Sequence, residues 1–435
     1  MTRSLASPLA PSPGLLDRLR AELDCPAADA LLRRAVRAAS VTGDEAAMVA
    51  MLRPEMDALN LAPIVEDFQP GRPNIHGRRE AGPGPRLLIM GHTDVVQARD
   101  WATRWAGHPQ EDAFDGAIVD GELWGRGAAD LKAGICTGLA ALDLLDRAGI
   151  RLAGSVSFAF VGDEESGEPG TGTSSGVRAY AAQVAEGRLP RPDFAIYVEP
   201  TRLAVMPVQI GFFIADVVLT GRSAYFGRPD LGRDALKAAH AVLSAIWMHS
   251  DDVAARAEHP LLGRPFVLVT GIAAGGLIAV PGECRLSLIR KLLPGETLDG
   301  ATAELEAAIH AAVSEGIEVA VAYPAGRDHP RGGSPAGIAL DHPAALRLSA
   351  CADAVRPGTG GLEGAPFWSE MPFLTGPIGC PAVYFAPGDI AICHTDEERV
   401  PLADYHDAIL ALAAFMAGFC GTEDDTSAAS TGDPR

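Results

Sequence analysis

The sequence has few basic residues for its size. Its 36 lysines and arginines are set against 56 aspartates and glutamates, and the formal net charge is -20 at pH 7. A field of this sign repels phosphate backbones, so we expect no nucleic acid partner. The same charge favours solubility and is compatible with the binding of cations.

The sequence also lacks paired cysteines and long apolar runs. The seven cysteines are scattered, with no C-x-x-C pair, which indicates reduced thiols in a reducing compartment. By inspection, no apolar run is long enough to span a bilayer, and the first 13 residues lack the apolar stretch of a signal peptide. We therefore expect a cytoplasmic protein without a membrane partner, with disordered tails at residues 1–13 and 422–435.

The chain does have length and apolar content. Its 435 residues exceed what one domain usually needs, and 48% of them are hydrophobic, so it can bury a large core. Between the termini, short apolar runs that end in an acidic residue alternate with helical patterns. This order is typical of an α/β, doubly wound, mostly parallel sheet whose ligands lie along one edge.

The most informative stretch begins at the apolar run 87–90, which is typical of a strand buried on both faces of a parallel sheet. Gly91 ends that run, and His92 and Asp94 follow. Alternate residues of an extended chain point the same way, so these two side chains would face one pocket. His92 could bind a metal, while Asp94 could accept its other ring N–H. Taken alone, the pair would more simply be a solvated polar loop.

Further acids follow the later elements. Asp130 stands at the start of a helix, after a glycine-rich stretch that lacks both G-x-x-x-x-G-K-[ST] and G-x-G-x-x-G, so we discount a phosphate site. Glu164 and Glu165 follow the apolar run 155–161, and Glu199 follows the run 193–198. Each acid alone would be a solvated turn.

A lone histidine, His394, lies on a late loop. Together with His92 and the carboxylates of Asp130, Glu165 and Glu199, it forms a set of nitrogen and oxygen ligands without thiolate. Such a set suits a pair of zinc ions at a hydrolytic site, although cobalt or manganese could replace them. Spacing alone does not prove that these residues converge.

A second domain is inserted at about residues 208–323. Its expected order is β-α-β-β-α-β, which is typical of a small α+β, ferredoxin-like domain. Residues 1–207 and 324–435 would then form the two parts of the first domain. A short strand at 61–65, followed by a Pro/Gly loop, is expected before the stretch at 87–96.

Five segments resemble one metallohydrolase family, that of acetylornithine deacetylase, succinyl-diaminopimelate desuccinylase, aminoacylase and carboxypeptidase G. The resemblance runs from about residue 28 to 419, and it is much more specific for the family than for any member. Its segments are Gly91-His92-Thr93-Asp94-Val95-Val96, the stretch from Trp124 to Gly134, Asp163-Glu164-Glu165, Glu199-Pro200-Thr201, and Ala386-Pro387-Gly388-Asp389 with His394-Thr395-Asp396-Glu397.

The resemblance implies two metal ions, held by His92, Asp130, Glu165, Glu199 and His394. Asp130 would bridge the ions, and Asp94 would support His92. Glu164 would be the general base that takes a proton from water and passes it to the leaving amine of an amide.

The inserted domain would be the family's lid and homodimer interface, and here the sequence departs from the family pattern. Tyr225 stands where members typically have a histidine, and Ile278 where they have an asparagine. The lid arginine would be Arg290 or, one register on, Lys291. These positions usually hold the oxyanion or the carboxylate of the substrate. The recognised end of the substrate would then differ from that of an ordinary N-acyl amino acid, or the lid would not act on a partner's site.

Near the C-terminus, Phe367-Trp368-Ser369-Glu370-Met371-Pro372-Phe373 resembles a stretch of bacterial acetylornithine deacetylases. Glu370 would meet an amine of the substrate, or it is a solvated loop acid. We expect hydrolysis of a small N-acyl amino acid or a related amide, with a dipeptidase or carboxypeptidase as the alternative. A non-catalytic binding homologue ranks below both, because all the ligands and Glu164 are present.

Overall fold

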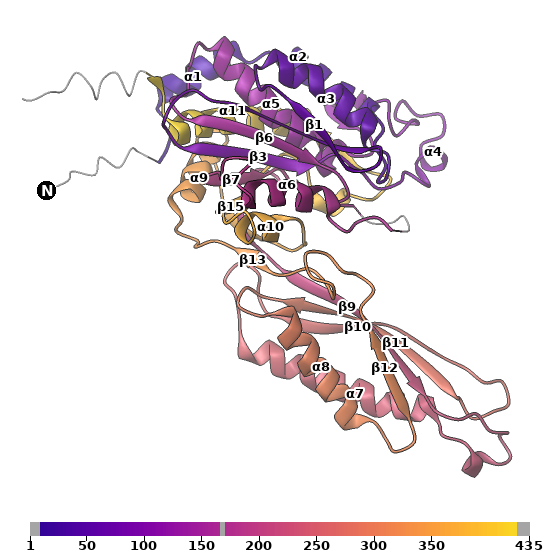
Figure 1. Cartoon of the computed structure of the whole chain (residues 1–435). Coiled ribbons are helices and arrows are strands. Elements are labelled where there is room, and N and C mark those ends of the chain that lie inside the picture. Colours follow the sequence, from indigo (N-terminus) through magenta and orange to yellow (C-terminus); the bar gives the residue numbers. More distant parts are fainter. Residues whose placement is uncertain (1–8, 166–169, 424–435) are drawn as a thin grey trace, which may run out of the picture. The chain divides into compact units, whose positions relative to one another are not determined.

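The computed structural model describes residues 9–165 and 170–423, which form two compact units (Figure 1). The first unit comprises residues up to 207 together with 337–363 and 373–423, and the second comprises 208–336 and 364–372. Of the tails expected at 1–13 and 422–435, residues 1–8 and 424–435 lie outside the described residues. The first helix begins at Pro13.

The first unit is built on a mixed sheet whose centre is parallel. Its strands follow the order β1-β2-β6-β3-β7-β15-β8-β13, and β14 pairs with β8. The central strands β6, β3, β7 and β15 are parallel to one another, which confirms the doubly wound α/β expectation. The strands are β1 Ile64–Gln69, β2 Arg72–Arg79, β3 Arg86–His92, β6 Ser155–Val161, β7 Phe194–Tyr197, β8 Val205–Gln209, β13 Ala336–Gly337, β14 Leu362–Ala365 and β15 Ala382–Tyr384.

Helices cover both faces of this sheet. In Figure 1, α5 and α11 lie over one face, and α6 lies against β1 and β6 on the other. Two-sided cover explains why six of the seven residues of β3 are buried. The helices are α1 Pro13–Glu22, α2 Cys25–Arg37, α3 Ala46–Ala58, α4 Trp101–Arg104, η1 Ala128–Lys132, α5 Ala133–Arg147, α6 Ser175–Ala185, α9 Pro343–Val355, α10 Met371–Thr375, η3 Ile390–Ile392 and α11 Leu402–Cys420.

A small antiparallel sheet joins two segments that lie far apart in the sequence. Its order is β16-β5-β4, with β4 at Ala117–Val119, β5 at Glu122–Trp124 and β16 at Arg399–Pro401. The pairing of β16 with β5 places the residues just before Arg399 beside the glycine-rich stretch that starts at Gly125.

Two expectations about the first unit need correction. The strand expected at 61–65 with a following loop is instead a hairpin of β1 and β2. Pro73 argued against a second strand, and it is accommodated beside a register shift between Asp67 and Gln69.

The closing helix α11 is, by length and composition, apolar enough to cross a membrane. From the sequence we expected no apolar run of that length. In the structure, 61% of its most apolar window is buried, because it packs on α5 and α9.

The second unit is a four-stranded antiparallel sheet with two helices. The strand order is β10-β11-β9-β12, and the chain order β9-α7-β10-β11-α8-β12 confirms the expected ferredoxin-like arrangement. Its core comprises apolar side chains from both helices and the sheet. The elements are β9 Gly211–Thr220, η2 Pro229–Leu231, α7 Ala235–Arg256, β10 Phe266–Ala274, β11 Glu283–Leu292, α8 Leu298–Ala312 and β12 Glu318–Ala322.

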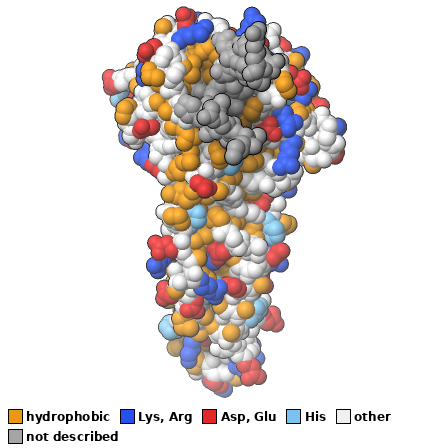
Figure 2. Space-filling view, turned by 90° about the vertical axis from the view of Figure 1, so that its left-hand side faces the viewer, with side chains coloured by type: hydrophobic (Ala, Val, Ile, Leu, Met, Phe, Trp, Pro, Cys, Tyr) orange, Lys and Arg blue, Asp and Glu red, His pale blue; other side chains and the backbone are white. Residues whose placement is uncertain are grey.

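Charged side chains of both signs are interspersed over the face drawn in Figure 2. The net charge of -20 is therefore not gathered into a single acidic patch on that face.

Candidate metal centre

Four of the five predicted ligands follow from the strand and helix order of the first unit. His92 is the last residue of β3, Glu165 follows β6, and Glu199 follows β7. Because these three strands are parallel neighbours, their carboxyl ends meet at one edge of the sheet. Asp130 lies in the irregular turn η1, where its backbone leaves helical geometry just before α5 begins. The peptide bond that follows it is cis.

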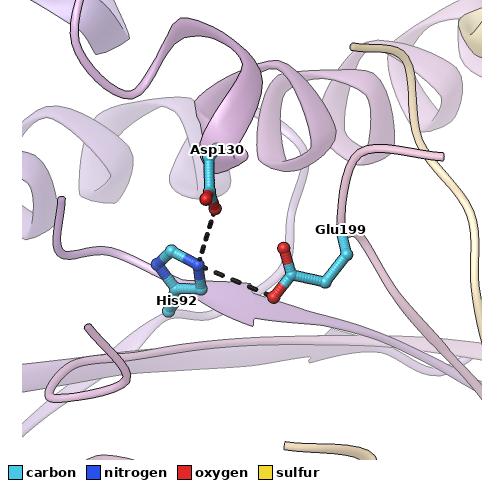
Figure 3. A group of neighbouring side chains, drawn as sticks. All are labelled: His92, Asp130 and Glu199. Atoms are coloured by element: carbon cyan, nitrogen blue, oxygen red, sulfur yellow. Dashed lines mark hydrogen bonds and ion pairs between the residues drawn. The ribbon is translucent and has the colours of Figure 1, made fainter. Parts of the chain in front are cut away.

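His92 meets two carboxylates at one ring nitrogen. Its Nε2 atom lies 3.1 Å from Asp130 Oδ1 and 3.7 Å from Glu199 Oε1, as Figure 3 shows. The three side chains converge from β3, from the start of α5 and from the loop after β7. They form one compact group of donor atoms.

His394 forms a second group with the other oxygen of Asp130. Its Nε2 atom lies 3.1 Å from Asp130 Oδ2 and 2.9 Å from Glu165 Oε1. Asp130 therefore turns one carboxylate oxygen toward each histidine, and each histidine has a glutamate of its own. The structure thus brings all five predicted ligands together.

The donor atoms are close and mostly buried. Among the described residues, three groups have ligand atoms that all lie within 4.8 Å of one another: His92 with Asp130 and Glu199, His92 with Glu164 and Glu165, and Asp130 with Glu165 and His394. The side chain of His92 is 1% exposed and that of Glu199 is 3% exposed, whereas that of His394 is 54% exposed. The centre is therefore open to solvent on the side of His394.

The tautomer of His92 is set by a backbone group. Its Nδ1 atom lies 2.9 Å from the carbonyl oxygen of Asp94, whereas the Asp94 carboxylate is 3.9 Å away. Because a carbonyl only accepts, Nδ1 carries a proton, and Nε2 is the ring atom that faces the carboxylates and could bind a metal. The expectation that the carboxylate of Asp94 would accept this N–H is therefore wrong.

The carboxylate of Asp94 instead holds the acidic pair. It accepts hydrogen bonds from the backbone N–H of Glu164, at 3.3 Å, and of Glu165, at 2.9 Å. Burial raises the pKa of Asp94 to about 7. Asp94 thus fixes the segment that carries Glu164 and Glu165 to the end of β3.

The protonation of the centre suits a bound cation. Burial, together with the charge of Asp130, raises the pKa of Glu165 to about 8. Burial opposes ionisation of Asp130 as well, but hydrogen bonds from His394 and His92 lower its pKa well below the usual range. The same carboxylates raise the pKa of His394 to about 11. Positive charge is therefore favourable here, and the nitrogen and oxygen donors fit divalent metal ions.

Two buried residues that the sequence analysis did not single out as functional support the centre. Glu398 is fully buried and accepts hydrogen bonds from the backbone N–H groups of Ala129 and Asp130. Arg126 pairs with Glu398 and also donates to the carbonyl of Thr395. In the sequence, Glu398 follows Asp396 and Glu397 and looks like one more solvated acid, so only its position next to the matched motif could have indicated it.

The other predicted site residues belong to the second unit. Tyr225 is 61% exposed and Ile278 is 62% exposed. Arg290 is buried, 2.5 Å from Glu296, and Lys291 donates to the carbonyl of Leu262 at 2.5 Å. The proposed contacts of Tyr225, Arg290 and Lys291 with substrate stay predictions.

Glu370 also lies in the second unit and is fully buried. The alternative of a solvated loop acid is therefore wrong for this residue. A contact between Glu370 and a substrate amine stays a prediction.

The part of the chain that carries the metal centre is also the part that is similar to known proteins. The family model described as Peptidase family M20/M25/M40 matches residues 88–418. A succinyl-diaminopimelate desuccinylase of Methylobacterium radiotolerans is 37% identical over 213 residues, which cover 46% of this chain and 50% of that protein. The match thus spans about half the length of this desuccinylase. An acetylornithine deacetylase of Myxococcus xanthus is 28% identical over 343 residues, which cover 77% of this chain and 80% of that one.

Among solved structures, the aminopeptidase PepT from Bacillus cereus superposes with a TM-score of 0.69 at 16% identity, covering 92% of this chain and 99% of that one. Similarity at this identity shows the fold alone. The family model, in contrast, covers well over half of the sequence and includes His92, Asp130, Glu164, Glu165, Glu199 and His394. The chain therefore belongs to peptidase family M20/M25/M40.

Proposed function

We propose that the protein is a two-metal amidohydrolase that cleaves the amide bond of a small N-acyl amino acid or a related compound. One observation carries the proposal. The two carboxylate oxygens of Asp130 face different histidines, and each histidine is paired with its own glutamate. This arrangement would suit two divalent ions, with Asp130 as a ligand of both.

Zinc is the metal we propose, with cobalt or manganese as substitutes, because the donors are imidazole nitrogens and carboxylate oxygens. His92 and Glu199 would hold one ion, His394 and Glu165 the other, and Asp130 both. When bound, such ions supply Lewis-acid polarisation of a carbonyl and make water acidic enough to react at neutral pH.

Glu164 is the proposed general base. It lies next to the ligand Glu165, its backbone N–H is held by Asp94, and its carboxylate approaches those of the centre. It would take the proton of the attacking water and pass it to the leaving amine. Glu164 would thus have to reach both the attacking water and the leaving nitrogen, and it is only partly buried.

The names of the relatives support a deacylase. The desuccinylase and deacetylase relatives are named for succinyl-diaminopimelate and acetylornithine, and the proposed substrate is of that chemical class. In the second unit, Tyr225, Arg290, Lys291 and Glu370 are the proposed substrate contacts. Because Ile278 carries no polar group, the recognised end of the substrate would differ from that of ordinary N-acyl amino acids.

A homodimer through the second unit is part of the proposal. Strand β10 stands at the edge of its sheet, and α7, which packs against it, exposes Trp247 and Met248. An open strand edge and a neighbouring apolar surface are features that a second copy could cover. A cytoplasmic location is proposed from the scattered cysteines alone.

The test combines metal content with a substrate panel. We expect about two equivalents of zinc per chain by elemental analysis, and turnover of N-succinyl or N-acetyl amino acids in preference to dipeptides. Glu164→Gln should lower kcat by about 10²- to 10⁴-fold while metal content is retained. The matched control is Glu397→Gln, an exposed acid near the centre, which should keep wild-type turnover.

The outcomes separate the alternatives. Turnover of dipeptides without turnover of acylated amino acids would identify a peptidase. A chain that binds no metal, or one whose activity is unchanged by Glu164→Gln, would refute the proposed mechanism.

A further inference from the structure

Two loops from distant parts of the chain supply two of the three proposed ligands of the second metal position. Asp130 lies in η1, just before α5, and His394 lies on the loop that follows η3. Their side chains meet at 3.1 Å. Such a distance depends on how the two loops are held against each other, since no secondary structure contains both residues.

A buried ion pair lies between these loops. Arg126 is 3% exposed and Glu398 is fully buried, and their side chains are in direct contact. Arg126 precedes Asp130 by four residues, and Glu398 follows His394 by four. The pair therefore connects the two loops, and each of its members lies four residues from the ligand on its own loop.

Glu398 fixes the loop of Asp130. One carboxylate oxygen accepts hydrogen bonds from the backbone N–H of Ala129, at 3.1 Å, and of Asp130, at 3.0 Å. The other oxygen receives Arg126. Hydrogen bonds to a charged acceptor are stronger than neutral ones, so the backbone of Asp130 is tied to Glu398.

Arg126 fixes the loop of His394. Its Nη2 atom donates to the carbonyl oxygen of Thr395 at 2.9 Å, while Nη1 contacts Glu398. A guanidinium can serve two acceptors at once in a fixed plane, which an ammonium cannot. One side chain thus holds the residue next to His394 and the carboxylate that holds Asp130.

Other contacts fasten the same loop but do not reach Asp130. Trp105 donates to the carbonyl of Asp396 at 2.5 Å, and the backbone N–H of Gly125 donates to the carbonyl of Glu398 at 3.2 Å. These bonds keep residues 394–398 near the glycine-rich stretch. Among the described contacts, the Arg126–Glu398 pair is the one that holds both the backbone of Asp130 and the residue next to His394.

We propose that Arg126, acting with Glu398, is a positioning residue that sets the separation of Asp130 and His394 and so the affinity of the metal ion held by Asp130, Glu165 and His394. The proposal rests on the two-ion site proposed above. The other ion depends on His92 and Glu199, neither of which contacts this pair among the described bonds. Asp130 belongs to both positions, but the bond of Arg126 to the carbonyl of Thr395 acts on the loop of His394, which belongs to one position alone. Loss of that bond should therefore weaken the position of His394 first.

A purely structural role predicts something different. A buried ion pair is a poor source of net stability, because desolvation of both charges opposes their attraction. If the pair served stability alone, its loss would lower the melting temperature and leave the two affinities in their wild-type ratio. The ratio of the two metal affinities is thus the readout that a structural role would not change.

The experiment measures stepwise zinc affinity by competition with a chromogenic chelator. Arg126→Lys keeps the charge and can contact Glu398, but it cannot also hold the carbonyl of Thr395. We expect it to weaken one of the two equivalents by about 10- to 100-fold, the range for residues that support metal ligands, and to leave the other unchanged. His394→Ala identifies the affected equivalent, and Arg126→Lys in that background should cause no further loss.

Two further variants provide a second test and a control. Glu398→Gln keeps an oxygen for the two N–H groups but loses the charge that pairs with Arg126, so it should weaken the same equivalent. Arg79→Gln removes a salt bridge between β2 and α5, Arg79 to Asp146 at 2.6 Å, and should leave both affinities unchanged.

The outcomes distinguish this inference from the proposed function. Wild-type protein that binds no zinc would overturn the two-ion site itself. Wild-type protein that binds two ions, with Arg126→Lys and Glu398→Gln binding both as tightly or losing both equally, would overturn only the role of Arg126.

Discussion

Gly134 offers the sharpest test of how the fold places the centre. It lies in the first turn of α5, four residues after Asp130, and packs against Val198, the residue before Glu199. A Cβ atom at position 134 would lie 2.2 Å from the carbonyl oxygen of Val198 and 2.7 Å from its Cβ. Non-bonded heavy atoms normally stay roughly 3.5 Å apart. Gly134→Ala must therefore push the start of α5 away from the end of β7.

The expected cost follows from two opposing terms. Overpacking of a tight core costs about 1–3 kcal/mol, whereas alanine gains roughly 1 kcal/mol over glycine inside a helix. Because the obstacle is backbone rather than a flexible side chain, the upper end of the first range applies, and we expect a net loss of about 2 kcal/mol. Separation of Asp130 from Glu199 should also weaken metal binding at the position that includes His92.

Gly138 provides the matched control in the same helix. A Cβ atom there would lie 2.9 Å from the Cγ2 atom of Ile89 and 3.1 Å from a ring carbon of Phe158. These are side-chain atoms that can shift by a few tenths of an ångström. The gain in helix propensity should offset the strain, so Gly138→Ala should stay within about 1 kcal/mol of wild type.

The measurement is urea unfolding of both variants after metal removal, followed by zinc titration of the native proteins. The reasoning is refuted if Gly134→Ala is as stable as wild type, or if Gly138→Ala is the more destabilised of the two. Destabilisation of Gly134→Ala with unchanged zinc affinity would refute the link between this contact and the centre.

Three more predictions concern charge and metal. Arg72 lies between the buried carboxylates of Glu45 and Asp163, at 2.9 Å from the latter. Arg72→Gln should therefore lower the free energy of unfolding by about 3–5 kcal/mol, measured by urea unfolding. A decrease below about 1 kcal/mol would contradict the importance of this pairing. Burial lowers the pKa of His76 below its usual 6.5, so the unfolded chain binds its proton more readily. The stability that neutral His76 contributes is complete above pH 6.5 and declines as the pH falls toward the pKa of the folded state. The decrease in the free energy of unfolding between pH 7.5 and 5.5 should therefore be smaller in His76→Gln than in wild type. Equal pH dependence of the two proteins would exclude the effect. Chelation of the metal should lower the melting temperature, because an ion at 100 times its Kd contributes about 2.7 kcal/mol; an unchanged melting curve would show that the native chain holds no stabilising ion.

Short-range pattern was a good guide to elements whose faces are both buried. Strand β3 lies where the apolar run 87–90 indicated it. The hairpin of β1 and β2 was missed because Pro73 and the intervening glycine argue locally for a loop, and only the neighbouring strand β6 makes β2 a sheet member.

Contacts between distant residues were harder to predict. The sequence predicted that Asp94 would bind the ring of His92, yet its carboxylate accepts the N–H groups of Glu164 and Glu165. Both readings use the same residue types at the same spacing. The choice depends on how the end of β6 is placed beside that of β3, which spacing along one strand does not contain.

The sequence by itself placed His92, Glu165 and Glu199 after apolar runs, because hydrophobic runs and the polar residues that follow them are local properties. Its resemblance to one family added Asp130 and His394 as candidate ligands. Only the tertiary structure decided that Asp130 turns one oxygen toward each histidine, and that Arg126 reaches Thr395, 269 positions away along the chain. The physical reason is that a buried charge takes the partner that packing brings within hydrogen-bond distance. That partner is chosen by the arrangement of whole strands and helices rather than by its neighbours in the chain.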